Sequence, residues 1–157
     1  MKHVSLFVVL VAACSFAPPL QAMPVDWTKV FECKIGSKVV TVRAMDDSII
    51  YEYGTEADKD LTISADAKDG NVVRHRTDRY AADYEQWRFI NKGYSYIVYH
   101  MDGNSQTGTK EVSGLTVLNG KQVISDKTCT SAPQMDVWDS SQITEDSEEY
   151  SAMSVGN

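Results

Sequence analysis

Bulky apolar and polar residues alternate along much of the chain, most densely in residues 84–99. Within this stretch, residues 87–89 and 94–98 alternate with a period of two. This period is typical of β-strands, because successive side chains point to opposite faces of a sheet. Asn91, Lys92 and Gly93 lie between the two runs. Since Asn and Gly tolerate a positive φ, the sequence predicts a central hairpin with Lys92 at its tip.

Other apolar or β-branched runs predict further strands, separated by turn signals about every eight to twelve residues. Asn119-Gly120 is another hairpin signal. No stretch shows sustained helical periodicity, so the pattern predicts an all-β fold, a small antiparallel β-barrel or sandwich of about seven to eight strands. Candidate strand segments outside the central hairpin lie around residues 31–34, 38–44, 48–53, 61–65, 71–80, 111–118 and 122–125.

The chain begins with the features of an export signal. Lys2 gives a positive start, residues 4–13 are apolar, and Ala22 is a small residue beyond a Pro-Pro pair. The apolar run is too short to span a membrane, so we expect a signal peptide of residues 1–22 and a periplasmic mature protein. Cys14 follows Val-Ala-Ala, which also fits the pattern before a lipid-modified cysteine. Lipidation of Cys14 would anchor the protein to a membrane, and the sequence leaves both alternatives open.

Cys33 and Cys129 are the only cysteines after the predicted signal peptide. An exported protein with two cysteines usually pairs them, so we expect a disulfide that brackets the strand-rich region. A metal site is the alternative, but the sequence has no CxxC motif and no histidine beside either cysteine. We expect one β-domain over residues 23–130.

The formal net charge of −7 is concentrated near the C-terminus. Residues 131–157 contain six acidic residues and no Lys or Arg, whereas residues 23–130 contain 16 acidic and 14 basic residues. Few apolar groups offset the entropy of ordering this acidic tail, so we expect residues 131–157 to be disordered. An acidic protein repels phosphates, which argues against nucleic-acid binding, and it attracts cationic proteins. Solubility is the simpler explanation of the charge.

The sequence contains no recognisable catalytic set. No GxSxG, SxxK, HExxH or EF-hand pattern occurs, and His75 and His100 are the only histidines after the predicted signal peptide. Carboxylates are plentiful, but no acid–base pair is singled out. We therefore expect a protein that is not an enzyme and that holds neither a cofactor nor a metal.

The most unusual local composition is a basic cluster of Arg74, His75, Arg76 and Arg79. Arginine forks match the geometry of carboxylates, so the cluster predicts a contact patch for an anionic group of a partner. The competing interpretation is an exposed strand face whose charge is balanced by nearby acids such as Asp78.

Two stretches of the chain, residues 76–80 (RTDRY) and 87–93 (WRFINKG), resemble the motifs of a known family. They are similar to Ser-Gly-x-x-Tyr and Tyr-x-x-x-Thr-Lys-Gly in the bacterial inhibitors of c-type lysozyme, whose membrane-bound and periplasmic forms share one small β-barrel. Matching residues are Tyr80, Lys92 and Gly93, near substitutions are Trp87 and Asn91, and departures are Arg76 and Thr77 in place of Ser and Gly. The resemblance spans roughly Cys33 to Cys129 and implies a barrel with a cysteine at each end.

The resemblance implies a protein that binds and inhibits a wall-degrading enzyme, with a cationic lysozyme as the first candidate partner. Lysozyme-type clefts carry two catalytic carboxylates, with which a cation on a rigid hairpin tip could pair. Lys92 is the candidate for this contact, Arg76 and Arg79 for a second one, and Tyr80 and Trp87 for the buried anchors of the interface. The alternatives are an immunity or chaperone-like protein for a secreted toxin, and an envelope structural or small-ligand-binding barrel.

Overall fold

The computed structural model describes residues 26–150 as β-strands and their connections, without a helix. Residues 1–25, which include the predicted signal peptide with Cys14, and residues 151–157 lie outside the described residues. No helix capable of crossing a membrane occurs in residues 26–150. The strands are β1 (Thr28–Ile35), β2 (Lys38–Met45), β3 (Ser48–Gly54), β4 (Lys59–Asp66), β5 (Val72–Thr77), β6 (Tyr84–Asn91), β7 (Tyr94–Met101), β8 (Val112–Asn119), β9 (Gln122–Thr128) and β10 (Thr144–Glu145).

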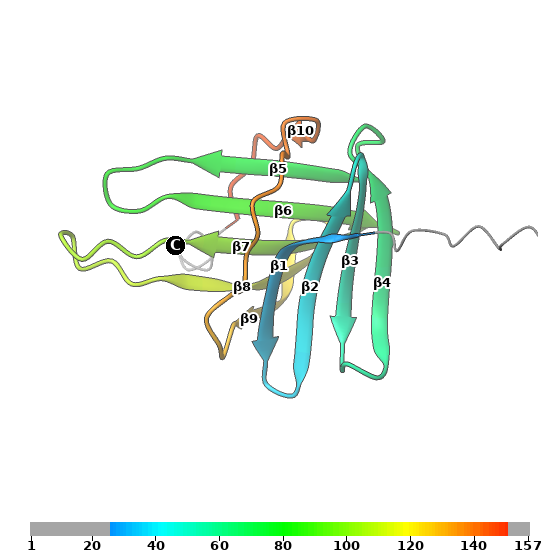
Figure 1. Ribbon diagram of the computed structural model, residues 1–157, viewed down its shortest axis with the longest axis horizontal. Helices are drawn as coiled ribbons and strands as arrows, with labels where there is room; N and C mark the ends of the chain where they lie inside the picture. The colour runs from blue at the N-terminus through cyan, green and yellow to red at the C-terminus, as the bar shows by residue number, and fades with distance from the viewer. Residues whose placement is uncertain (1–25, 151–157) are drawn as a thin grey trace, which may run out of the picture.

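The strands form two sheets that pack face to face. β1 to β4 make an antiparallel meander, and the second sheet has the order β10-β5-β6-β7-β8-β9, in which β10 alone is parallel to its neighbour. In Figure 1 the strands of one sheet run across those of the other, as in orthogonal sandwiches. The all-β prediction is confirmed, and the fold is a sandwich of two separate sheets rather than a closed barrel. The ten described strands exceed the predicted number partly because β10 forms in the segment expected to be disordered.

Apolar residues at every second position of the strands form the core. In β2, Val40, Val42 and Ala44 are fully buried, whereas Arg43 faces the opposite side and is exposed. Aromatic rings fill the space between the sheets, and the ring centroids of Tyr51 and Phe89, from opposite sheets, lie 5.4 Å apart. Each fully buried large apolar side chain contributes about 1.5–3 kcal/mol relative to an exposed one, so this shared core holds the sheets together.

The predicted disulfide is confirmed. Cys33 in β1 and Cys129, just after β9, are bonded with their Cα atoms 5.8 Å apart. Beside the bond, the backbone N–H of Thr130 donates to the carbonyl of Lys34 at 2.7 Å. The disulfide therefore joins the first strand of one sheet to the end of the last long strand of the other.

Residues 131–150, here called the C-terminal segment, are ordered, so the prediction of a disordered tail is wrong for the described part of residues 131–157. The segment first runs beside β1, where Gln134 bridges Glu32, and then reaches β5, which pairs with β10 (Figure 1). Ile143 and Asp146 are only 6% and 2% exposed. The expectation failed because composition counts apolar and charged residues, whereas order here depends on where a few of them are placed.

Candidate partner-binding surface

Lys92 lies at the tip of the β6–β7 hairpin, as predicted. Asn91 ends β6 and pairs with Tyr94, so the two turn residues are Lys92 (φ 49°) and Gly93 (φ 83°). A positive φ at both central positions is typical of a type I′ turn, which matches the twist of the flanking strands. β6 and β7 both have a bonded neighbour on each side, so the exposed Lys92 projects from a well-supported frame.

Arg76, Arg79 and Tyr80 lie at the opposite end of the same sheet. Arg76 pairs with Glu85 near the start of β6, whereas Lys92 follows the end of that strand. The eight residues of β6 span about 25 Å at the rise of an extended strand. The structure therefore separates the predicted contact residues into a hairpin tip and a distant patch, and they do not form one surface.

Trp87 belongs to the core, so the prediction that it anchors an interface is wrong. Its side chain is 2% exposed, and its ring centroid lies 6.4 Å from that of Phe31 in the other sheet. The period of two in β6 explains this position, because Trp87 and Phe89 share the face that looks toward the other sheet. Trp87 also lines a hollow of about 230 Å³ beside the C-terminal segment, but at 2% exposure it offers almost no surface to a partner.

Tyr80, in contrast, is 83% exposed, which is unusual for a large aromatic side chain. The loop that carries it is braced by the β7–β8 loop. Asn104 donates from Nδ2 to the Tyr80 carbonyl at 2.9 Å, and Thr107 donates from Oγ1 to the Ala81 carbonyl at 3.2 Å. The backbone at Tyr80 is thus held by the neighbouring loop, and its ring faces solvent at the far end of the sheet.

Each member of the basic cluster has a carboxylate near it within the chain. The acids come from β6, from the β5–β6 loop and from the C-terminal segment. The cluster therefore fits the competing interpretation, a strand face balanced by nearby acids, better than an open patch for a partner. The contacts are Arg74 to Glu85 (2.9 Å), Arg76 to Asp78 (3.1 Å), Arg79 to Glu149, and His75 to Glu145 (3.7 Å) and Glu149 (3.6 Å).

The C-terminal segment is held on β6 by a buried polar network. The Asp146 carboxylate accepts from Arg88 Nη2 at 2.6 Å and from Gln86 Nε2 at 3.1 Å. The Gln86 amide also bonds the backbone of the segment twice, from Nε2 to the Glu148 carbonyl and from the Tyr150 N–H to Oε1, both at 2.8 Å. Gln86 is fully buried, and its amide bonds the backbone of the segment with one donor and one acceptor, as a neighbouring strand would.

A second hairpin tip lies beside Lys92. The β8–β9 turn consists of Gly120 and Lys121, and the Gly120 N–H donates to the carbonyl of Gly93 at 3.3 Å. β7 and β8 pair directly, with Tyr94 opposite Asn119, which places both turns at the same end of the sheet. The sequence predicted each hairpin but not their proximity, because strand order is not visible in the pattern.

Lys92 and Lys121 differ from many other basic residues of the protein. Lys29, Lys38 and Lys68 each pair with a carboxylate. Within residues 26–150, neither Lys92 nor Lys121 makes an ion pair or a side-chain hydrogen bond, and both are exposed. These ammonium groups are therefore available to an external anion.

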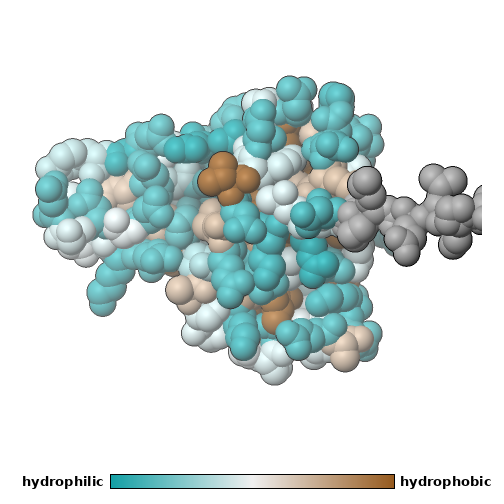
Figure 2. All heavy atoms as spheres, viewed as in Figure 1, coloured by the Kyte–Doolittle hydropathy of each residue, from teal (hydrophilic) through white to brown (hydrophobic). Residues whose placement is uncertain are grey.

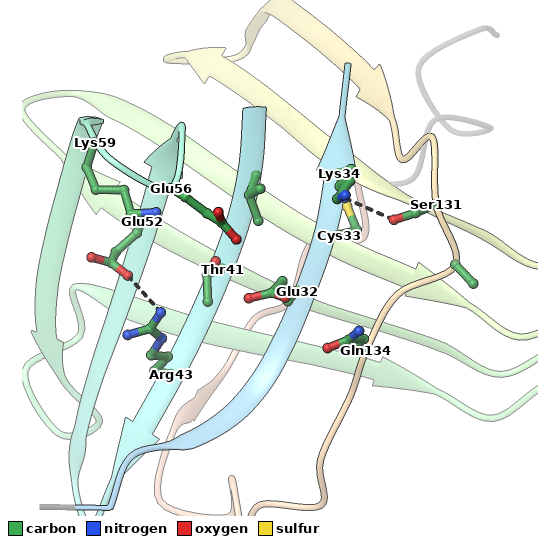
Figure 3. Close-up of a pocket in the computed structure, with 12 residues that line it drawn as sticks. Glu32, Cys33, Lys34, Thr41, Arg43, Glu52, Glu56, Lys59, Ser131 and Gln134 are labelled. Carbon is green, nitrogen blue, oxygen red and sulfur yellow. Dashed lines mark hydrogen bonds and ion pairs between the residues drawn. The ribbon is translucent and has the colours of Figure 1, made fainter. Parts of the chain in front are cut away.

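A polar hollow of about 570 Å³ lies on the outer face of the four-stranded sheet (Figure 3). Its floor includes Thr41 and the loose ion pair of Arg43 and Glu52 (3.8 Å), and Gln134 stands at one side. The hollow lies outside the core and is lined by groups of both charges. It thus differs from the internal apolar pocket that a small-ligand-binding barrel would need.

Apolar side chains on the face seen in Figure 2 are scattered among hydrophilic ones. Val137, fully exposed, and Met135, 37% exposed, belong to the part of the C-terminal segment that runs beside β1. In residues 26–150, no group of three or more His, Cys, Asp or Glu side chains is arranged to hold a metal ion.

No protein-family model, curated protein or solved structure matches the chain. The geometry of the chain itself is therefore the basis for inferring its function, and the lysozyme-inhibitor resemblance stays a hypothesis.

Proposed function

We propose that this protein is an exported binding module that inhibits a wall-degrading enzyme, with the β6–β7 hairpin tip as the part that enters the enzyme's cleft. One observation carries the proposal: Lys92 is an exposed cation at the tip of a hairpin held in the middle of a sheet. A cleft that hydrolyses polysaccharide carries two carboxylates. An ammonium group presented on a narrow, braced turn has the charge and the shape to reach them.

The net charge of the protein and the local charge of the hairpin tip would act at different steps of binding to the enzyme. The net charge of −7 favours approach to a cationic protein, since complementary fields raise association rates. Once the surfaces meet, the positive tip contacts the carboxylates of the cleft. The basic cluster plays a smaller part in this scheme than the sequence suggested, because its members face carboxylates of the same chain.

The test is inhibition of cell-wall lysis across a panel of lysozymes of several types, with the parent protein and Lys92→Ala. Losing a charge pair that is buried at an interface costs about 2–5 kcal/mol or more, so Lys92→Ala should weaken inhibition at least about 30-fold. Lys110→Ala is the matched control, because Lys110 is an exposed lysine at the other end of the same sheet. Equal inhibition by the parent and Lys92→Ala would remove the main support for the proposal.

A further inference from the structure

The two neighbouring hairpin tips present two lysines, of which Lys121 has no counterpart in the predicted site. The hydrogen bond from the Gly120 N–H to the Gly93 carbonyl fixes one turn against the other. Both turns continue strands of the same sheet, so neither can move without disturbing the β7–β8 ladder. The relative position of Lys92 and Lys121 is therefore set by the sheet rather than by a flexible loop.

The spacing of the tips follows from the strand order. The β6–β7 turn and the β8–β9 turn are centred two strand intervals apart, which is about 10 Å at the usual spacing of strands. Lysine side chains are long and flexible, so their ammonium groups can come somewhat closer or move further apart than the turns. The two carboxyl groups of glycoside hydrolases lie about 5–9.5 Å apart, depending on whether the enzyme retains or inverts configuration. The two tips thus have the spacing needed to address two such carboxylates.

We propose that Lys121 and Lys92 act together as a two-cation prong, in which each ammonium group pairs with a different catalytic carboxylate of a polysaccharide-cleaving enzyme. This inference depends on the proposed function and adds to it a second contact residue and the charge pattern of the partner site. Both lysines are exposed and lack an ion pair in residues 26–150, so binding an anion breaks no contact that stabilises the fold.

The β4–β5 turn lies at the same end of the sheet and marks where the positive surface of the prong ends on the β5 side. The Ile90 N–H donates to the carbonyl of Asn71, which places the β4–β5 turn next to the β6–β7 turn. That turn carries Lys68, already paired with Asp47, and the exposed Asp69. The positive part of this end is therefore confined to the Lys92 and Lys121 turns, which gives the prong a defined orientation on its partner.

The test measures inhibition constants for Lys92→Gln, Lys121→Gln and the double variant, with Lys110→Gln as the control for a general loss of charge. The assay uses the full chain and the enzyme that the parent inhibits best. Each single substitution at the tips should weaken inhibition at least about tenfold and the control less than about twofold. Circular dichroism and the urea midpoint should stay at the parent values for all variants, because the glutamine keeps the turn and most of the side-chain volume.

Pairing with separate carboxylates is tested by repeating the series on enzyme variants in which one or the other catalytic carboxylate is replaced by its amide. Lys92→Gln should lose its effect on one enzyme variant and Lys121→Gln on the other. If Lys92→Gln weakens inhibition and Lys121→Gln does not, the prong is wrong and the proposed function stands. If neither does, or if the parent inhibits no enzyme of the panel, both proposals are wrong. If Lys110→Gln weakens inhibition as much as the tip variants do, the loss is due to net charge alone, and the prong is also wrong.

Discussion

Arg88 and Asp146, 58 residues apart, are joined by a 2.6 Å ion pair in which only 1% of the Asp146 side chain is exposed. A carboxylate this deeply buried is tolerated only with a partner and further hydrogen bonds, which Gln86 and the Glu148 N–H supply here. The pair fixes the end of the C-terminal segment on the outer side of β6. It is the clearest sign that this acidic segment belongs to the fold.

Asp146→Ala should destabilise the protein by about 3–5 kcal/mol, because it leaves the largely buried Arg88 with only a 3.7 Å contact to the half-exposed Glu148. The measurement is the free energy of unfolding from urea titration. Glu145→Ala is the control, since the Glu145 side chain is 65% exposed, and it should change stability by less than about 0.5 kcal/mol. Similar small changes for both variants would mean that the segment contributes little to the folded state.

Apolar contacts of the C-terminal segment should matter as well. Ile143 is 6% exposed and packs against the core, so Ile143→Ala should cost about 2–5 kcal/mol. Val137, in the same segment, is fully exposed, and Val137→Ala should stay within about 0.5 kcal/mol of the parent. Ending the chain at Thr130 removes the Ile143 and Asp146 contacts together and should lower stability by more than either substitution. A truncated protein that melts within a few degrees of the parent would show that this packing is dispensable.

Reduction tests for the Cys33–Cys129 bond, and substitution of both cysteines measures its contribution to stability. Intact mass with and without reductant should differ by two hydrogens, and the unreduced protein should offer no free thiol among these two cysteines. The bond joins residues 96 positions apart, for which the chain-entropy model gives up to about 4.7 kcal/mol. The double variant Cys33→Ala/Cys129→Ala should therefore unfold at a clearly lower urea concentration. An unchanged midpoint would argue against this contribution.

The turn at Lys92 permits a test with opposite outcomes at adjacent positions. Lys92 has φ 49°, which lies in the left-handed region, where the backbone of residues other than Gly and Asn is strained. Lys92→Gly should therefore raise stability by about 0.5–1 kcal/mol. Gly93 has φ 83°, and Gly93→Ala should lower stability by about 1 kcal/mol or more. The measurement is the thermal midpoint of each variant relative to the parent protein. A loss of stability in both variants would contradict the type I′ assignment.

Stability should fall at alkaline pH because of buried tyrosines. Burial raises the pKa of Tyr51 and Tyr84 above the usual value near 10, and it raises the pKa of Tyr99 to about 12. Above pH 10 the unfolded chain has lost phenolic protons that the folded chain keeps, so the free energy of unfolding declines as pH rises. Each such group contributes up to about 1.4 kcal/mol per pH unit. Below pH 10 these groups are protonated in both states, and the contribution is constant.

Urea midpoints between pH 8 and pH 11.5 measure this decline. Tyr51→Phe should make the decline shallower, because it removes one of the raised phenols and keeps the ring that packs on Phe89. An unchanged slope in Tyr51→Phe would show that this hydroxyl ionises as readily in the folded protein as in the unfolded one.

The sequence predicted local features well, since period-two alternation and glycine-containing turns depend on near neighbours. It located the β6–β7 hairpin, the strand β2 and the disulfide. It misplaced Trp87 because alternation shows that a residue faces one side of a strand without showing which side is covered. It missed the proximity of the Lys92 and Lys121 turns because that proximity depends on β7 and β8 being neighbours. It misjudged the acidic segment because Arg88, the group that makes Asp146 acceptable, is far away in the chain.

The disulfide also decides what happens when the backbone is cut. Cys33 and Cys129 close the intervening residues into a covalent ring that contains β2 to β9. A protease that cleaves one exposed loop inside this ring, such as the connection between β7 and β8, leaves two fragments that stay tied together. A cut just beyond Cys129 has a different result, because no covalent bond then joins the residues that carry Asp146 to the ring. A cut inside the ring therefore leaves its two parts covalently joined, whereas a cut beyond Cys129 leaves the C-terminal segment attached only by non-covalent contacts such as the Arg88–Asp146 pair.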